Sequence, residues 1–157
     1  MNGRALRSLL FPDPPTRLGR YIGLMQTSRD RGYPRFAMLM SRRIARRFGC
    51  YISWKARIAR NVHFPHPTGV VIGDGVVVEA DATLYQHVTL GARRLGEART
   101  GQYPVVRSGA VLFAGAVVVG AIEIGRDAVV GANSVVFQSV PPGATAVGAP
   151  ARVKVST

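Results

Sequence analysis

The sequence predicts an all-β solenoid, a parallel β-helix of hexapeptide repeats that follows a short basic N-terminal helical segment. Bulky apolar residues recur at every sixth position, and most are followed four residues later by a small or apolar residue. They form three runs: Ile52, Ile58 and Phe64; Ile72, Val78, Leu84 and Leu90; Val106, Leu112, Val118, Ile124, Val130 and Val136. A period of six fits neither an α-helix nor an alternating strand, but it fits short strands that turn at the corners of a three-sided prism. We therefore expect residues 50–141 to form a prism with three hexads per coil, stacked through parallel strand pairing.

Two interruptions of the period mark the places where a functional site is expected. The step from Phe64 to Ile72 is eight residues, so the chain should bulge by two residues beside His66. The step from Leu90 to Val106 is sixteen residues, so residues 91–105 should leave the prism as an excursion loop. Bulges and loops on a regular framework are common positions for functional side chains.

The first 49 residues are expected to form a basic arm and a helix. Residues 1–34 are rich in Pro, Gly and Arg, which is typical of an irregular segment with at most one short helix. From Pro34 onward the apolar residues recur at the spacing of one helix face, and Gly49 is a suitable stop. These residues are Phe36, Met40, Ile44 and Phe48. The helix should cover one end of the prism, and residues 142–157 should form a C-terminal cap at the other.

Positive charge is concentrated in the N-terminal part of the chain. Residues 1–60 contain 14 Lys and Arg against two acidic residues, whereas residues 61–157 contain seven against six. Such a field favours anionic partners. The first expectation is that the arginines of the helix are solvated. Docking on an anionic membrane surface is the alternative, and nucleic acid is the least favoured partner.

Apolar residues also bear on location and assembly. No apolar run approaches the roughly 20 residues that span a bilayer, and the N-terminus lacks the pattern of a signal peptide. We therefore expect a cytoplasmic protein, with peripheral attachment to the cytoplasmic face of a membrane as the alternative. The single cysteine, Cys50, excludes an internal disulfide.

Apolar residues at outward positions predict an oligomer packed along one prism face. These are Val77, Val111, Phe113, Val117, Val119, Val129, Val135 and Phe137.

Several segments resemble one family in combination: "TGVVIGDG", "TLYQHVTLGA", "VVGANSVV" and "VPPGATAVGAPARV". They are similar to the hexapeptide-repeat acyltransferases, in the serine O-acetyltransferase branch, over roughly residues 50–154. The resemblance implies that the β-helix is left-handed and that the protein is a homotrimer. It also implies acetyl-CoA as co-substrate and acetyl transfer at a cleft between adjacent subunits.

The segment "PHPTG" aligns with the catalytic-histidine segment of that branch, which assigns the base to His66. Pro65 stands where the branch has an aspartate, and Gln102 and Tyr103 stand where it has an arginine and a histidine. The "FPHPTG" form looks closer to acetyltransferases of exopolysaccharide and capsule gene clusters. The first expectation for the acceptor is therefore a sugar hydroxyl, in a small molecule or glycan, and the alternative is L-serine. A non-enzymatic scaffold that binds an anionic polymer or membrane is the third hypothesis.

The chemistry of acetyl transfer assigns roles to the remaining candidates. His66 would act as general base, and Pro65 and Pro67 would hold its backbone stiffly. Tyr103 would donate to the oxyanion or contact the acceptor, and His87 and Gln102 would also contact the acceptor. The alternatives are an aromatic packed in a subunit interface for Tyr103 and a surface or interface residue for His87. The resemblance assigns Gly91, Ala92, Ala114 and Ala132 to pantetheine, and Arg152 and Lys154 to the coenzyme phosphates. Each of the four small residues is equally explained as a corner residue of the prism.

Two other chemistries are less favoured. Cys50 precedes the prism, so direct attack by the acceptor is expected rather than a covalent enzyme intermediate. His63, His66 and His87 raise the possibility of a zinc site, but their spacing is unsuitable and no metal is expected.

Overall fold

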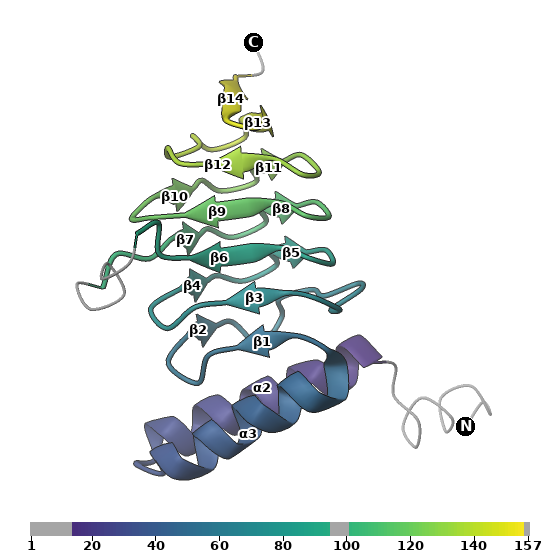
Figure 1. Ribbon diagram of the computed structural model, residues 1–157, viewed down its shortest axis with the longest axis vertical. Coiled ribbons are helices and arrows are strands. Elements are labelled where there is room, and N and C mark those ends of the chain that lie inside the picture. The colour runs from purple at the N-terminus through teal and green to yellow at the C-terminus, as the bar shows by residue number, and fades with distance from the viewer. Residues whose placement is uncertain (1–13, 95–100, 156–157) are drawn as a thin grey trace, which may run out of the picture.

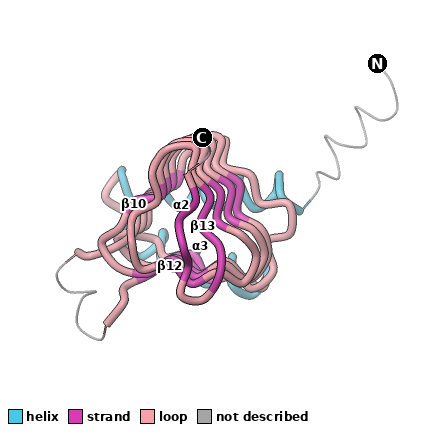
Figure 2. The backbone as a smooth tube through the Cα atoms, turned by 90° about the horizontal axis from the view of Figure 1, so that it is seen from above, coloured by secondary structure: helices cyan, strands magenta, loops and turns pink. Residues whose placement is uncertain are grey.

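The computed structural model describes residues 14–94 and 101–155. They form a three-sided prism that stands on a pair of helices (Figure 1). Viewed from above, the strands of successive coils lie over one another along the sides of the prism (Figure 2). Residues 1–13 of the expected arm, 95–100 of the excursion loop and 156–157 of the C-terminal tail lie outside the described residues.

The strands pair in three sheets. The first sheet contains β1 (Tyr51–Ile52), β3 (Val71–Ile72), β6 (Thr89–Gly91), β9 (Val117–Val119) and β12 (Val135–Val136). The second contains β2 (Arg57–Ile58), β4 (Val77–Val78), β7 (Val105–Val106) and β10 (Glu123–Ile124). The third contains β5 (Thr83–Leu84), β8 (Val111–Leu112), β11 (Val129–Val130), β13 (Thr145–Gly148) and β14 (Ala151–Lys154). Pairing is parallel except between β13 and β14.

The register confirms the parallel solenoid and both interruptions. Ile72 pairs with Leu90, eighteen residues later, which is one coil of three hexads. Ile52 pairs with Ile72, twenty residues later, so the first coil contains the two extra residues. Leu90 pairs with Val118, twenty-eight residues later, so the excursion adds ten. All the hexad residues of the three runs are buried and fill the prism.

The base of the prism rests on α2 (Pro14–Asp30) and α3 (Pro34–Phe48). The α3 segment begins with Pro34 and ends before Gly49, whose left-handed backbone closes the helix. The 17-residue α2 corrects the expectation of an irregular segment before residue 34. Leu18, Ile22 and Met25 are buried, so tertiary packing stabilises this helix. Its glycines and arginines made the helix hard to predict from the sequence. Neither described helix is long and apolar enough to cross a membrane.

Polar side chains of the helices bond to the open edge of the first coil. Gln26 donates to the carbonyl of Ile58 and accepts from its N–H, both at 2.8 Å. Ser41 donates to the carbonyl of Ile52 at 2.6 Å, and Arg29 donates to the carbonyl of Ala56 at 2.7 Å. These bonds replace the strand that an interior coil would have beneath it, so the helices terminate the solenoid.

At the other end, the antiparallel β13–β14 hairpin covers the last coil. Its first strand continues the third sheet by pairing with β11. A single bridge between Ile124 and Val140 extends the second sheet.

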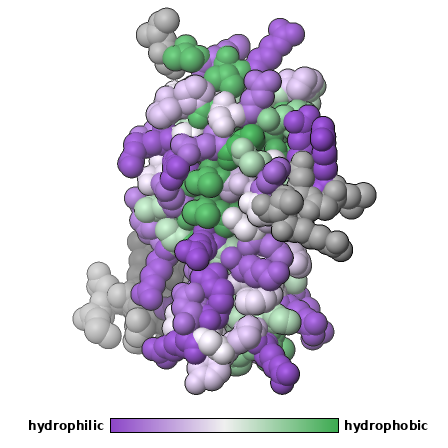
Figure 3. Space-filling view, turned by 90° about the vertical axis from the view of Figure 1, so that its left-hand side faces the viewer, coloured by the Kyte–Doolittle hydropathy of each residue, from purple (hydrophilic) through white to green (hydrophobic). Residues whose placement is uncertain are grey.

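The outward apolar residues do not share one face, which corrects the expectation from sequence. Val77 lies on the second sheet, Val111 and Val129 lie on the third, and Val117 and Val135 lie on the first. One view of the surface shows apolar residues gathered midway up the prism and mainly polar residues around the helical base (Figure 3).

Candidate functional site

Nearly all of the candidate residues lie at two edges of the first sheet. The His66 corner consists of the turns that lead from the third sheet into the first: residues 65–70, 85–88, 113–116 and 131–134. The Tyr103 corner consists of the turns that lead from the first sheet into the second; its described residues are 53–56, 73–76, 92–94, 101–104 and 120–122. Both corners run parallel to the prism axis.

The two extra residues of the first coil fall in the His66 corner. The turn is fixed by the Val70 N–H, which donates to Pro67 at 3.2 Å, and by the Gly69 N–H, which donates to Gly49 at 2.7 Å. Pro67 is buried and Pro65 is half-buried, while His66 between them is exposed. The bulge therefore presents an imidazole to the surface from a segment anchored on both sides.

His87 lies directly above this segment, one coil higher. Its N–H donates to the Thr68 carbonyl at 3.0 Å, and its ring occupies the space over Gly69. A Cβ added to Gly69 would lie 2.1 Å from the His87 Nδ1. Gly69 has φ +71°, so two separate reasons favour glycine at this position. His87 thus packs on the segment that carries His66.

Ala114 and Ala132 continue the same corner upward. Gly115 donates to Gln86, and Asn133 donates to Ala114, both at 2.9 Å, so the coils at this edge are in regular register. The side-chain oxygen of Gln86 is buried and has no hydrogen-bond partner among the described residues. Because a buried unpaired acceptor is costly, the site is suited to a ligand or neighbouring chain that brings an N–H or O–H.

Above them, Arg152 and Lys154 lie on β14, at the top of the third sheet, and both are exposed. The structure thus arranges Ala114, Ala132 and the two cations in ascending order above His66. Gly91 and Ala92 are separated from this set, because they lie at the opposite edge of the first sheet.

The Tyr103 corner has its own polar cluster. Asp74 accepts from Ser53 at 2.7 Å and from the Lys55 Nζ at 2.9 Å. Partial burial opposes ionisation of Asp74, but the bonds from Lys55 and Ser53 outweigh it, so its pKa lies below the usual value. The Tyr103 ring covers Gly75, where an added Cβ would lie 2.3 Å from it. Burial and the charge of Asp74 raise the pKa of Tyr103, so its phenol keeps its proton at neutral pH.

One protomer does not bring the two corners together. His66 precedes β3, whereas Tyr103 and the exposed Gln102 follow β6, at the other end of the first sheet. One side of the prism, five to six extended residues, separates them by roughly 15–20 Å. They could act on one substrate only if they came from two copies of the chain.

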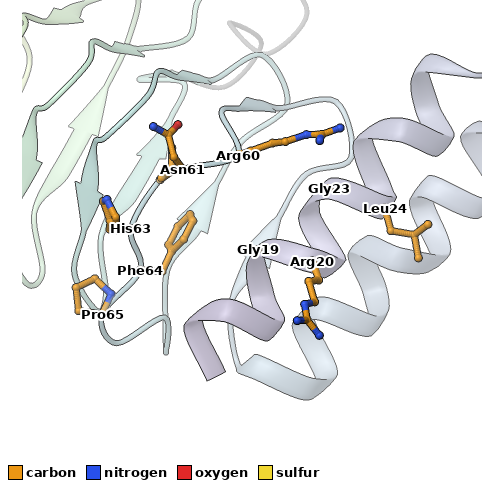
Figure 4. A pocket seen from close by; sticks show the side chains of 10 residues that line it. Gly19, Arg20, Gly23, Leu24, Arg60, Asn61, His63, Phe64 and Pro65 are labelled. Atoms are coloured by element: carbon orange, nitrogen blue, oxygen red, sulfur yellow. The ribbon is translucent and has the colours of Figure 1, made fainter. Parts of the chain in front are cut away.

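A groove of about 710 Å³ lies between α2 and the first coil, beside the His66 corner (Figure 4). Gly19 and Gly23 face it from the helix, and Arg60 extends toward the helix from the coil. Pro65, the residue before His66, lines its end together with His63. Sequence reasoning missed this groove and Gln86, because neither the α2 segment nor an unpaired oxygen has a signature in the sequence.

The described residues contain neither a metal site nor an activated cysteine nucleophile. No group of three or more His, Cys, Asp or Glu side chains is placed to hold a metal ion within residues 14–94 and 101–155. Cys50 is buried, and burial raises the pKa of its thiol to about 11. The nucleophilic thiolate is therefore scarce at neutral pH.

The chain is similar to serine acetyltransferases in sequence and in structure, although no family model matches it. It is 39% identical over 124 residues to the serine acetyltransferase of Salmonella typhimurium, which covers 79% of this chain and 45% of that protein. A serine acetyltransferase in complex with cysteine superposes with a TM-score of 0.85 and 32% identity, over 96% of this chain and 58% of that one. The serine acetyltransferase of Brucella abortus in complex with coenzyme A gives a TM-score of 0.82 and 32% identity, over 88% and 54%.

The chain therefore spans about half the length of the curated relatives it matches. The expected closer likeness to exopolysaccharide and capsule-cluster acetyltransferases finds no support, because the relatives found are serine acetyltransferases.

Proposed function

We propose that this chain is a hexapeptide-repeat acyltransferase that moves an acetyl group from acetyl-CoA to a hydroxyl acceptor. The observation that carries the proposal is the two-residue bulge that exposes His66 on a fold similar to serine acetyltransferases. Histidine has an ordinary pKa of about 6.5, which suits a general base near neutral pH.

The chain's own residues supply the steps of direct transfer. His66 takes the proton from the acceptor hydroxyl, whose oxygen attacks the thioester carbonyl; collapse of the tetrahedral intermediate expels the coenzyme thiolate, which is protonated as it leaves. Tyr103 keeps its proton at neutral pH and serves as a donor to the oxyanion. The buried Cys50 thiol is unsuited to an acyl-enzyme step, which favours direct attack.

The His66 corner fits an extended coenzyme. Three coil steps separate the levels of His66 and Ala132, which is about 14 Å along the axis. Small side chains at Ala114 and Ala132 leave room for pantetheine near the backbone, and the unpaired oxygen of Gln86 suits an amide N–H. The cations Arg152 and Lys154 stand at the top of this path, where they suit phosphate groups.

The separation of the two corners supports an assembly in which corners of different copies meet. A site that uses His66 together with Tyr103, Gly91 and Ala92 needs the His66 corner of one copy beside the Tyr103 corner of another. A homotrimer of parallel prisms satisfies this requirement three times by rotation. The left-handed winding implied by the resemblance belongs to the same proposal.

For the acceptor, the relatives favour L-serine over the sugar that was expected first. One observation keeps a sugar as the second candidate. The groove beside Pro65 has a volume of about 710 Å³ and is lined by Arg20 and Arg60. Pockets of this size hold ligands much larger than a free amino acid, and the arginines suit an acidic or phosphorylated sugar.

Release of the coenzyme thiol, measured with L-serine and with a panel of sugars and sugar phosphates, tests the proposal. We expect turnover with L-serine and a loss of at least 100-fold in kcat for His66→Ala. His63→Ala is the matched control for the reaction with L-serine, because it removes an exposed imidazole from the same coil; it is not a control for sugars, because His63 lines the groove. Turnover with a sugar phosphate alone would support the second candidate, and no release with any acceptor would support the non-enzymatic scaffold. Full activity of His66→Ala would refute the assignment of the base.

A further inference from the structure

The outer face of α3 combines positive charge with apolar surface. The helix contains five arginines and no acidic residue: Arg35, Arg42, Arg43, Arg46 and Arg47. No salt bridge found within residues 14–94 and 101–155 involves any of them. Five uncompensated guanidinium groups within four turns repel one another, so an anionic partner is the physical complement of this helix.

Apolar side chains lie exposed on the same helix. Leu39 is 55% exposed, Phe36 is 42% exposed and Met38 is 37% exposed. Leu39 and four of the arginines also line a shallow groove of about 400 Å³. A nucleic acid would pair its phosphates with the arginines but offer no apolar partner to the aliphatic Leu39 and Met38, whereas the boundary between headgroups and acyl chains accommodates both kinds of side chain. The composition of the face therefore favours a lipid surface over nucleic acid.

The helix α3 lies at the end of the prism (Figure 1), and Leu39, Arg42 and Arg46 are exposed. The buried residues Ala37, Met40, Ser41 and Ile44 face the rest of the protein, and Ser41 bonds to the first coil. By the period of the helix, Leu39, Arg42 and Arg46 lie on the opposite side. Bonds from Gln26, Arg29 and Ser41 fix the helices to the prism, so the orientation of this face determines the orientation of the prism.

We propose that the outer face of α3 docks the protein on an anionic phospholipid bilayer, with the prism standing on the membrane. The first coil, which carries His66, then lies one helix layer, about 10–12 Å, above the headgroups. The groove between α2 and that coil opens at the same level. This inference goes beyond the proposed function and does not depend on catalysis. In a trimer of parallel prisms, three such faces would share one end and bind together.

Vesicle co-sedimentation of the full chain tests the docking. We expect binding to phosphatidylcholine vesicles with about 30% phosphatidylserine and little binding to phosphatidylcholine alone. Binding should weaken as salt rises from roughly 0.05 to 0.5 M. Arg42→Gln/Arg46→Gln should lower the partition coefficient about 30-fold. The matched control, Arg57→Gln/Arg126→Gln, removes the same charge from exposed positions on the prism. It should change the partition coefficient by less than about twofold.

Other outcomes would overturn the proposal. An equal loss of vesicle binding in both double variants would mean that net charge drives binding without a defined face. Tight binding of a single-stranded RNA, without vesicle binding, would replace the lipid with nucleic acid. A change of oligomeric state in the Arg42/Arg46 variant alone, measured by analytical ultracentrifugation, would show that the face contacts a second copy.

The orientation has its own readout. Trp54, the single tryptophan, lies in the first coil beside the helices, where its carbonyl accepts from Arg29. Upright docking predicts energy transfer from Trp54 to dansyl-labelled headgroups, and the Arg42→Gln/Arg46→Gln variant should lose it. Vesicle binding without energy transfer would refute the upright orientation.

Discussion

The same corner of the prism is built in two ways. In the upper coils the His66 corner repeats at eighteen residues, and the Asn133 side chain lies over Gly115 of the coil below. In the first coil the corner contains two extra residues, and a histidine ring, His87, lies over Gly69. The comparison shows how a repeating framework acquires a site. The core residues keep their six-residue phase, and the added residues lie in the turn at the corner.

Glycine substitution should have the largest effect on stability in this comparison. Gly69→Ala places a side chain at φ +71° and against the His87 ring. We expect a loss of about 2–3 kcal/mol and a fall in Tm of roughly 5–10 °C by calorimetry. Gly91→Ala is the control, since nothing lies within 4 Å of its added Cβ, and its Tm should stay near that of the wild type. Equal Tm values for both variants would show that the first-coil corner is not specially constrained.

The next largest effect should come from the base of the first coil. Gln26→Ala removes both side-chain bonds to the Ile58 backbone and leaves that edge unpaired. Denaturant unfolding should show a loss of about 1–3 kcal/mol. Gln138→Ala, an exposed residue in the last coils, should change stability by less than about 0.5 kcal/mol. An unchanged free energy of unfolding in Gln26→Ala would mean that the helices stabilise the first coil only through apolar packing.

Loosening the bulge should affect activity more than stability. Pro65→Ala/Pro67→Ala increases the backbone freedom of the unfolded chain and should cost about 1–2 kcal/mol. Because the imidazole would be less firmly placed, kcat should fall while KM for acetyl-CoA changes little. Steady-state kinetics separates the two constants. A rise in KM with unchanged kcat would assign the prolines to binding instead of to the placement of His66.

The smallest effect should come from an ion ladder on the second sheet, away from the bulge. Arg107 bridges Glu79 at 2.7 Å and Glu123 at 2.5 Å across successive coils. Its hydrogen bonds hold the pKa values of both carboxyl groups below the usual 4.5. The stabilisation is therefore present above about pH 4.5 and is lost as the pH falls through the lowered pKa values. The difference in Tm between wild type and Arg107→Gln should shrink on acidification; a constant difference would exclude the carboxylates as its source.

Much of the framework could be predicted because it depends on local repetition. Every residue of the three hexad runs is buried, and the steps of eight and sixteen residues located the bulge beside His66 and the excursion after Leu90. Periodicity says nothing about how a solenoid ends. The helix α2 and the bonds of Gln26 depend on contacts between distant parts of the chain, which no local pattern contains.

The candidate site was less predictable for a similar reason. Sequence placed His66 at the bulge, and the resemblance assigned its role, but neither showed that His87 packs on Gly69 or that the Gln86 oxygen is unpaired. The expectation from sequence places the outward apolar residues on one face, although three hexads per coil place successive hexads of one run on different sides of the prism. The structure distributes them over three sheets.

Subunit complementation tests the central claim, that the site combines the His66 corner of one copy with the Tyr103 corner of another. His66→Ala removes the base, and Gly91→Phe fills the open space at the other corner, so each variant alone should be inactive. Equal amounts of the two, unfolded and refolded together, should recover about one quarter of the wild-type activity, because about that fraction of interfaces pairs two intact corners. Mixed assemblies that form but remain inactive would contradict the account.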